Sequence, residues 1–282
     1  MAHAGWLNMV VAAVLSVTLL AGCATSPTGR RQLQLFPEQQ MAQMGTEAYG
    51  NIKQQTPASQ DKAVNQYVEC VADAIIRVLP EGRNKPSDWE VTVFRSDQIN
   101  AFALPGGKIG VYTGLLRVAQ NQAQLGAVLG HEVGHVLAHH ANARLSANYA
   151  TMAGLTVVSV LAGASGGQRD RQTMMALLGL GVQVGVLLPF TRSQESEADL
   201  IGLNLMARAG FKPQESIELW HQMAKASNGE PPEFLSTHPS HSTRIQDLRD
   251  HMPEAQREYE QAGRHPSCRR AVPEKVDSGK KK

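Results

Sequence analysis

The chain has 282 residues and a formal net charge of +2, with 42% hydrophobic and 18% charged residues. This length allows one large domain or two small ones, and the composition excludes an intrinsically disordered or collagen-like protein. Residues 264–282 hold a basic surplus larger than the net charge of the whole chain, so the rest of the protein is slightly acidic. We therefore expect a folded protein that does not bind nucleic acid.

Near its start the chain has an apolar run over residues 6–21, and the end of this run forms the sequence Leu20-Ala21-Gly22-Cys23. Such a run, ending in small residues, is typical of a secretory signal peptide. It is shorter than the roughly 20 residues of a membrane-spanning helix, which makes a short membrane anchor the less favoured alternative. The sequence resembles the lipobox of bacterial lipoproteins. This resemblance implies a signal peptide over residues 1–22, acylation of Cys23 and a lipid-anchored tether over residues 23–35.

The next elements predict a mainly helical α+β domain. Helical spacing of apolar residues predicts helices over residues 37–52 and 61–79, and β-prone runs over 89–94 and 108–113 predict a small sheet. Asn121, with Gln124 three residues later, predicts a helix start, and this helix is expected to run to about Leu145.

Residues 149–189 form two apolar halves, each shorter than a membrane span, which favours a buried helical hairpin over two spans. A helix over residues 193–209 is expected to close at Gly210, and Pro213 should start another that reaches about Ala226. A last short helix is expected around residues 244–251. The prediction is thus one domain over residues 36–251 and a basic C-terminal tail over 252–282.

The strongest chemical signal is His131-Glu132-Val133-Gly134-His135 within the helix that starts at Asn121. At 3.6 residues per turn, His131 and His135 share one helical face, so both imidazoles can bind one metal ion. Glu132 points away from that face but stays adjacent, where a carboxylate can accept a proton from water. The pattern predicts a metal-dependent hydrolase.

A zinc protease of this type needs a third protein ligand. The extended motif with a third histidine is excluded because Ala138 and Ala141 occupy the required positions. Glu195 and Asp199 lie four residues apart on one helical face, so Glu195 can bind the metal while Asp199 accepts a hydrogen bond from a ligating imidazole. Glu197 points away from both and is expected to be solvated or salt-bridged.

Four motifs resemble the HtpX-like and CAAX-prenyl-protease-type zinc metallopeptidases, a gluzincin family. They lie at residues 100–107 (Asn-Ala-Phe-Ala-Leu-Pro-Gly-Gly), 129–135, 192–199 (ending in Glu-Ala-Asp) and 237–239 (Thr-His-Pro), the last followed by Arg244. The resemblance covers residues 36–251, and the short remainder is similar to that of the LoiP-like bacterial lipoprotein members.

This resemblance implies a zincin-type domain that holds one Zn²⁺ per chain. It assigns the zinc ligands to His131, His135 and Glu195, and the general base to Glu132. Asp199 is expected to orient a ligand or transfer a proton, with Arg244 as a supporting residue. His238 is expected either to stabilise the oxyanion or to cap the zinc in a resting state.

The expected function is a zinc metalloendopeptidase of the bacterial envelope that cleaves unfolded or extended polypeptides. An exposed strand edge at Lys108, Ile109, Gly110 and Val111 could hold such a substrate. Ala24 after the acylated cysteine suggests an outer-membrane lipoprotein facing the periplasm, in contact with envelope assembly machinery or misfolded outer-membrane proteins. The alternative function is a zinc-stabilised chaperone or assembly factor with little proteolytic activity.

The two remaining cysteines, Cys70 and Cys268, are expected to form a disulfide if the protein occupies an oxidising compartment, although two free thiols remain an alternative. Glycines recur at every fourth position at Gly126, Gly130 and Gly134. We expect this glycine stripe to serve close helix packing.

Overall fold

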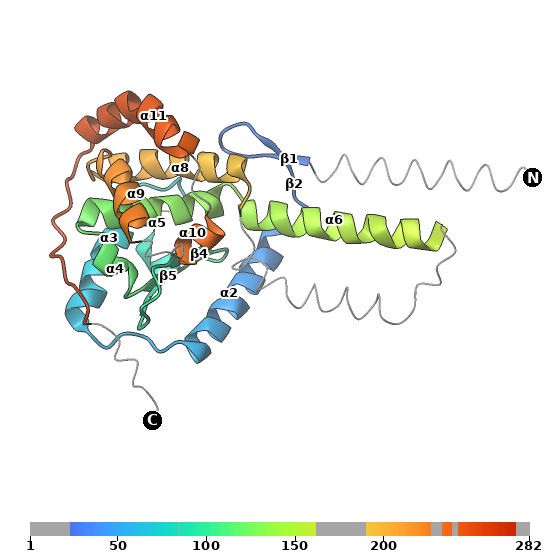
Figure 1. Ribbon diagram of the computed structural model, residues 1–282, viewed down its shortest axis with the longest axis horizontal. Coiled ribbons are helices and arrows are strands. Elements are labelled where there is room, and N and C mark those ends of the chain that lie inside the picture. The colour runs from blue at the N-terminus through green and yellow to red at the C-terminus, as the bar shows by residue number, and fades with distance from the viewer. Residues whose placement is uncertain (1–22, 84, 162–189, 227–232, 239–241, 275–282) are drawn as a thin grey trace, which may run out of the picture.

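The computed structural model describes residues 23–83, 85–161, 190–226, 233–238 and 242–274. The predicted signal peptide lies outside these residues. The described part is mainly helical with a small sheet, as the sequence predicts. Helices α11 (Ser242–Gln261), α8 (Arg192–Arg208) and α5 (Gln122–Leu137) lie in successive layers over the sheet (Figure 1). Helix α5, with the metal-binding motif, is thus enclosed between α8 and the sheet.

The sheet has three strands, β3 (Glu90–Phe94), β4 (Ala101–Leu104) and β5 (Lys108–Tyr112), in the order β3-β5-β4. Strand β5 pairs in parallel with β3 and antiparallel with β4, so it lies in the centre. Among the described residues, β4 has a strand partner on one side only, and it packs against α5.

The predicted substrate edge is therefore wrong. Both sides of β5 are occupied by neighbouring strands, and this applies to Lys108, Ile109, Gly110 and Val111 alike. The sequence shows that these residues are β-prone but not where the strand stands in the sheet. The edge strands are β3 and β4. An isolated bridge to Ala58 covers the end of β3 at Phe94, whereas β4, which the sequence analysis did not predict as a strand, has no second strand partner among the described residues.

Two helices precede the sheet, as predicted: α2 (Glu38–Gln55) and α3 (Lys62–Arg77). Asp61 caps α3 by accepting hydrogen bonds from the backbone N–H groups of the first turn. The predicted disulfide between Cys70 of α3 and Cys268 is present, with Cα atoms 5.7 Å apart. It fastens the C-terminal segment to the helical body.

The helix that carries the predicted metal-binding motif is shorter than expected. Asn121 caps its start, as expected, but α5 ends at Leu137 and a separate helix, α6, begins at His140. The break is at His139, which adopts a left-handed conformation with φ of 53°. Neither histidine nor its alanine neighbour is a helix breaker. Because the turn brings the His140 ring back onto His135, we attribute it to this tertiary contact.

Helices α5 and α8 approach unusually closely through the glycine stripe. A Cβ atom on Gly130 would lie 2.8 Å from the carbonyl oxygen of Gly202, and one on Gly134 would lie 2.9 Å from that of Ala198. Larger residues would push the helices apart. This confirms that the stripe serves helix packing, and it brings the acidic residues of α8 within reach of the histidines of α5.

The ends of α8 follow local signals. Thr191 and Gln194 form a capping box at its start. Gly210, with φ of 80°, follows its last turn, as predicted. The chain continues through α9 (Glu215–Lys225) and α10 (Glu233–Thr237). The short elements before α5 are the 3₁₀ turn η1 (Pro86–Asp88) and helix α4 (Leu115–Val118).

The last helix is longer than expected. Helix α11 continues beyond residue 251 to Gln261 with Pro253 inside it. Ala255 is fully buried, and Met252 and Tyr259 pack against the main core. This burial offsets the hydrogen bond that the proline removes. Residues 252–261 are thus part of the folded body rather than of a tail.

The segment predicted to be a tether is also folded. Strands β1 (Cys23–Thr25) and β2 (Arg31–Leu33) form an antiparallel hairpin, which we call the N-terminal hairpin. It lies beside the start of α6 (His140–Leu161), which projects from the body (Figure 1). Most of the predicted apolar hairpin lies outside the described residues. No helix in the described ranges is both long and apolar enough to cross a membrane.

Candidate active site

The structure brings together four side chains, three from two helices and one from the residue that follows a third helix. His131 and His135 come from α5, Glu195 from α8, and His238 follows α10. One possible ligand atom from each lies within 4.8 Å of all the others, and all four residues are buried. The sequence-predicted pair of histidines and the distant glutamate therefore converge on one point.

Four of the six separations between these atoms are short enough for the atoms to share one metal ion. The Nε2 atoms of His131 and His135 are 3.1 Å apart, and His131 Nε2 lies 3.2 Å from His238 Nδ1. Glu195 Oε1 lies 3.0 Å from His238 Nδ1 and 3.5 Å from His135 Nε2. Ligands at zinc–nitrogen and zinc–oxygen bond lengths occupy tetrahedral corners roughly 3.4 Å apart.

The hydrogen bonding around the cluster supports the same conclusion. The δ-nitrogen of His131 is bonded to Asp199, and that of His135 to His140, so both rings present their ε-nitrogens to the shared point. Glu195 Oε2 is buried without a hydrogen bond, although Arg244 lies 2.7 Å away outside hydrogen-bonding geometry. Nitrogen and carboxylate donors of this kind are ligands that zinc prefers.

His131 is held by a buried ion-pair network. Its Nδ1 lies 2.9 Å from Asp199, which in turn accepts two hydrogen bonds from Arg244, at 2.6 and 2.7 Å. Burial opposes ionisation of Asp199, but the Arg244 charge outweighs it and lowers the pKa of Asp199 to about 2. Asp199 is therefore an ionised acceptor that orients the His131 ring, in the position that the sequence predicts.

His135 is electrostatically suited to metal binding. Burial lowers its pKa well below the usual value, and positive charge on His131 and His238 acts in the same direction. A low pKa keeps the imidazole neutral, and only a neutral imidazole has a lone pair to offer a metal.

Glu132 lies next to the cluster without joining it. One of its carboxylate oxygens is 3.3 Å from His238 Nε2, and the backbone of Ala103 in β4 provides a hydrogen bond. Burial raises the pKa of Glu132 above its usual value. A raised carboxyl pKa suits a general base, because the group must release the proton that it accepts.

Aromatic rings cover the cluster. The Phe190 ring lies 3.8 Å from the His135 ring and stacks on the His238 ring at 5.1 Å. Phe234 also stacks on His238, at 4.6 Å. The Arg144 guanidinium lies over Phe190, 3.7 Å from the ring centroid. These contacts contribute to the burial of the His135 and His238 rings.

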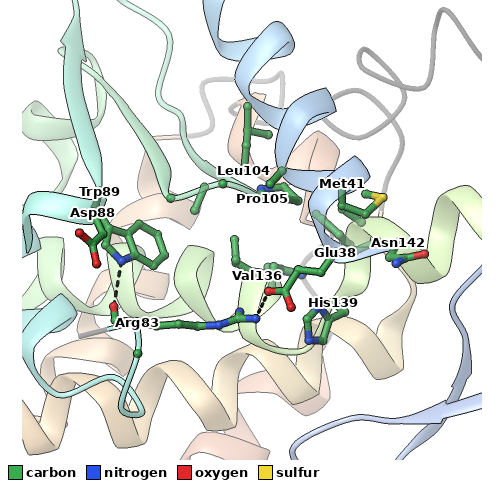
Figure 2. A pocket seen from close by; sticks show the side chains of 18 residues that line it. Glu38, Met41, Arg83, Asp88, Trp89, Leu104, Pro105, Val136, His139 and Asn142 are labelled. Carbon is green, nitrogen blue, oxygen red and sulfur yellow. Dashed lines mark hydrogen bonds and ion pairs between the residues drawn. The ribbon is translucent and has the colours of Figure 1, made fainter. Parts of the chain in front are cut away.

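A cavity of about 210 Å³ opens beside His135 (Figure 2). Its apolar walls come from α2, η1, β4 and α5. They include Met41, Trp89, Leu104, Pro105 and Val136. At the rim, Arg83 is ion-paired with Glu38, and the Trp89 indole donates a hydrogen bond to the Arg83 carbonyl at 3.0 Å. The volume matches one large side chain rather than a cofactor.

Three residues near the cluster differ from the sequence prediction or were missed by it. Glu197 is salt-bridged, as expected, but it is buried and contacts His140. His139 is half-buried and lines the cavity. His140 is fully buried against His135. Helical periodicity could not reveal this contact because the helix breaks between the two histidines.

Comparison with known proteins agrees with this geometry. Residues 60–252 match peptidase family M48. The chain is 36% identical over 188 residues to the mitochondrial metalloendopeptidase OMA1 of Schizosaccharomyces pombe, which covers 66% of this chain and 53% of that protein. It is 32% identical over 218 residues to the beta-barrel assembly-enhancing protease of Yersinia pestis, covering 76% and 44%.

The corresponding Escherichia coli protease is 31% identical over 217 residues, covering 75% of this chain and 43% of that protein. The chain thus spans about half the length of the curated relatives it matches. The matched region contains α5, α8 and His238, which together form the cluster. The chain therefore belongs to peptidase family M48.

Proposed function

We propose that this protein is a zinc metalloendopeptidase that hydrolyses peptide bonds in extended or unfolded polypeptides. The observation that supports this most strongly is the convergence of the donor atoms of His131, His135, Glu195 and His238, with Glu132 beside them. The names of the relatives, a metalloendopeptidase and a protease, favour the same activity.

In this proposal His131, His135 and Glu195 hold the ion permanently. Bound there, zinc supplies a Lewis acid that polarises the scissile carbonyl and acidifies water. Glu132 accepts the proton from water and returns it to the leaving amine. Asp199 and Arg244 do not touch substrate; they keep the His131 ring oriented.

His238 has a separate role in this scheme. Four protein ligands leave no corner for water, whereas a catalytic zinc site needs one. We assign the arrangement in which His238 would also hold the ion to a resting state. Hydrolysis would then require His238 to leave the ion, and its imidazole would be free to donate a hydrogen bond to the developing oxyanion.

Strand β4 is the proposed site for the substrate backbone. Its open side runs past Glu132, so an extended peptide could add to the sheet there through main-chain hydrogen bonds. The cavity beside His135 would take one side chain of that peptide, and its Trp89, Met41 and Leu104 walls favour a bulky apolar one. Main-chain recognition with one apolar subsite predicts broad specificity.

The test is hydrolysis of a denatured polypeptide such as unfolded casein by the purified protein. We expect one equivalent of zinc, loss of cleavage with a zinc chelator, and recovery when zinc is added back. Mass spectrometry should find a large apolar residue next to most cleaved bonds. Cleavage that persists after complete removal of zinc would contradict the proposal.

We also propose that the protein is a lipoprotein of the bacterial outer membrane, anchored through Cys23 and facing the periplasm. The lipobox-like sequence before Cys23 supports the anchor. The relatives named beta-barrel assembly-enhancing protease support a role beside envelope assembly machinery, with misfolded outer-membrane proteins as substrates.

Metabolic labelling with a palmitate analogue tests this anchor. The intact protein should incorporate the label and sediment with outer membranes, whereas Cys23→Ser should remain unlabelled. Cys70 and Cys268 serve as internal controls, because both are bonded to each other and cannot accept the lipid. Equal labelling of the parent and the variant would rule out Cys23 as the acylation site.

A further inference from the structure

The N-terminal hairpin contacts the buried acid Glu197 of α8. Arg30 Nε donates a hydrogen bond to Glu197 Oε2 at 2.7 Å, and Thr28 Oγ1 donates one to Glu197 Oε1 at 2.5 Å. The Glu197 side chain is 3% exposed and that of Arg30 is 28% exposed. A charged residue of the hairpin therefore reaches into the body and pairs with a carboxylate that solvent cannot satisfy.

The same carboxylate connects the hairpin to the metal cluster. Glu197 Oε2 lies 3.0 Å from His140 Nε2, and His140 Nδ1 lies 2.8 Å from His135 Nδ1. His140 is fully buried. The hydrogen bonds thus run without interruption from Arg30 through Glu197 and His140 to His135.

Only one placement of protons satisfies every hydrogen bond between Arg30 and His135 while His135 binds a metal. A metal at His135 Nε2 leaves the proton on Nδ1, which donates to His140 Nδ1. The proton of His140 is then on Nε2 and donates to Glu197, which also accepts from Arg30. Each donor meets one acceptor, so this series of hydrogen bonds favours the tautomer of His135 that metal binding requires.

The hydrogen bonds that hold His135 resemble those that hold His131, the other histidine of the motif. His131 is oriented by Asp199, which is itself held by Arg244. For His135, the carboxylate is one residue further away, because His140 stands between them, and the arginine comes from the N-terminal hairpin. Arg30 lies outside residues 60–252, which match the peptidase family.

We propose that Arg30, Glu197 and His140 are positioning residues that hold the ring of His135 for metal binding, so that the N-terminal hairpin is part of the metal site. This inference rests on the proposed function only in requiring that His135 bind zinc. Loss of such an outer partner typically weakens metal affinity by roughly 10- to 100-fold.

The test measures zinc affinity by competition with a chromogenic chelator. Arg30→Ala should raise the zinc dissociation constant by about 10- to 100-fold, and Arg30→Lys should recover part of the loss because it keeps a charged donor. Arg31→Ala is the matched control, because the Arg31 side chain is next in sequence and is exposed. It should change the zinc dissociation constant less than twofold. A value for Arg30→Ala equal to that of Arg31→Ala would overturn the proposal.

Two further measurements separate positioning from simple loss of folding. Ser146→Ala removes the hydrogen bond to the Leu35 backbone at 2.8 Å and so loosens the segment after the hairpin without touching Glu197. It should leave zinc affinity nearly unchanged.

Nitrogen NMR of the zinc-bound parent protein needs no variant. It should find the proton of His135 on Nδ1 and that of His140 on Nε2. The opposite tautomer at His140 would contradict the proposal, even if Arg30→Ala failed to fold. Neither zinc affinity nor the tautomers depend on peptide hydrolysis, so failure of the proposed function would be seen separately.

Discussion

Glu132→Gln is expected to lower the rate of peptide hydrolysis by roughly 10²- to 10⁴-fold, the contribution of a positioned acid–base group. The amide has the same size as the carboxylate and can keep the contact to the Ala103 backbone, but it cannot accept a proton. Glu132 lies outside the proposed ligand set, so the variant should still bind one zinc ion. Kinetics and metal analysis on the same preparation check both statements.

Glu254→Gln makes the same chemical change at an exposed position of α11 and should leave the rate unchanged. The comparison also decides between the two functions considered from the sequence. A chaperone that uses zinc only for stability should suppress aggregation of unfolded proteins equally well with either residue at position 132. If Glu132→Gln cleaves polypeptides as fast as the parent, the assignment of Glu132 as general base fails.

Arg244→Met is expected to lower the free energy of unfolding of the metal-free protein by roughly 3–5 kcal/mol, because it leaves buried acids without their charged partner. Arg244 is 1% exposed, pairs with Asp199 and Glu195, and lies 3.9 Å above the Trp220 ring. Methionine fills much of the volume of the arginine side chain. The expected loss of stability therefore comes from the lost charge rather than from a cavity. Denaturant unfolding measures the loss.

Two comparisons isolate the charge effect. Arg249→Met, at an exposed position of the same helix, should change stability by less than about 0.5 kcal/mol. Adding Asp199→Asn to Arg244→Met should restore part of the loss, since the unpaired charge is then absent. Additive losses in the double variant would show that the two residues do not act as a pair.

The same pair predicts how stability depends on pH. The pKa of Asp199 is lowered from 3.8 to about 2 in the folded protein, so its ionised form contributes stability above pH 3.8. That contribution is lost as the pH falls towards 2. Because Arg244→Met removes the cause of the lowered pKa, its stability should vary less over this acid range than that of the parent.

The parts of the site that depend on local spacing were predictable from sequence. His131 and His135 share a face because they lie four residues apart on one helix, and the same spacing places Glu195 and Asp199 together on α8. Their joint position around one ion requires the close approach of α5 and α8. The glycine stripe indicated that approach, because small residues every four positions allow helix backbones to meet.

The unpredicted features depend on tertiary contacts. The central position of β5 follows from strand order, which alternation of residues cannot reveal. The break at His139 has no local cause, since its neighbours favour a helix. Arg30 lies more than a hundred residues from His140 in sequence and could be linked to it only through the folded hairpin.

The folding of the hairpin up to Cys23 itself has a spatial consequence. A lipid attached at that residue would leave no slack between the bilayer and the peptidase body. The proposed active site would then stay at a nearly constant distance from the membrane. If Cys23 carries the proposed lipid, polypeptides close to the bilayer surface would be the most accessible substrates.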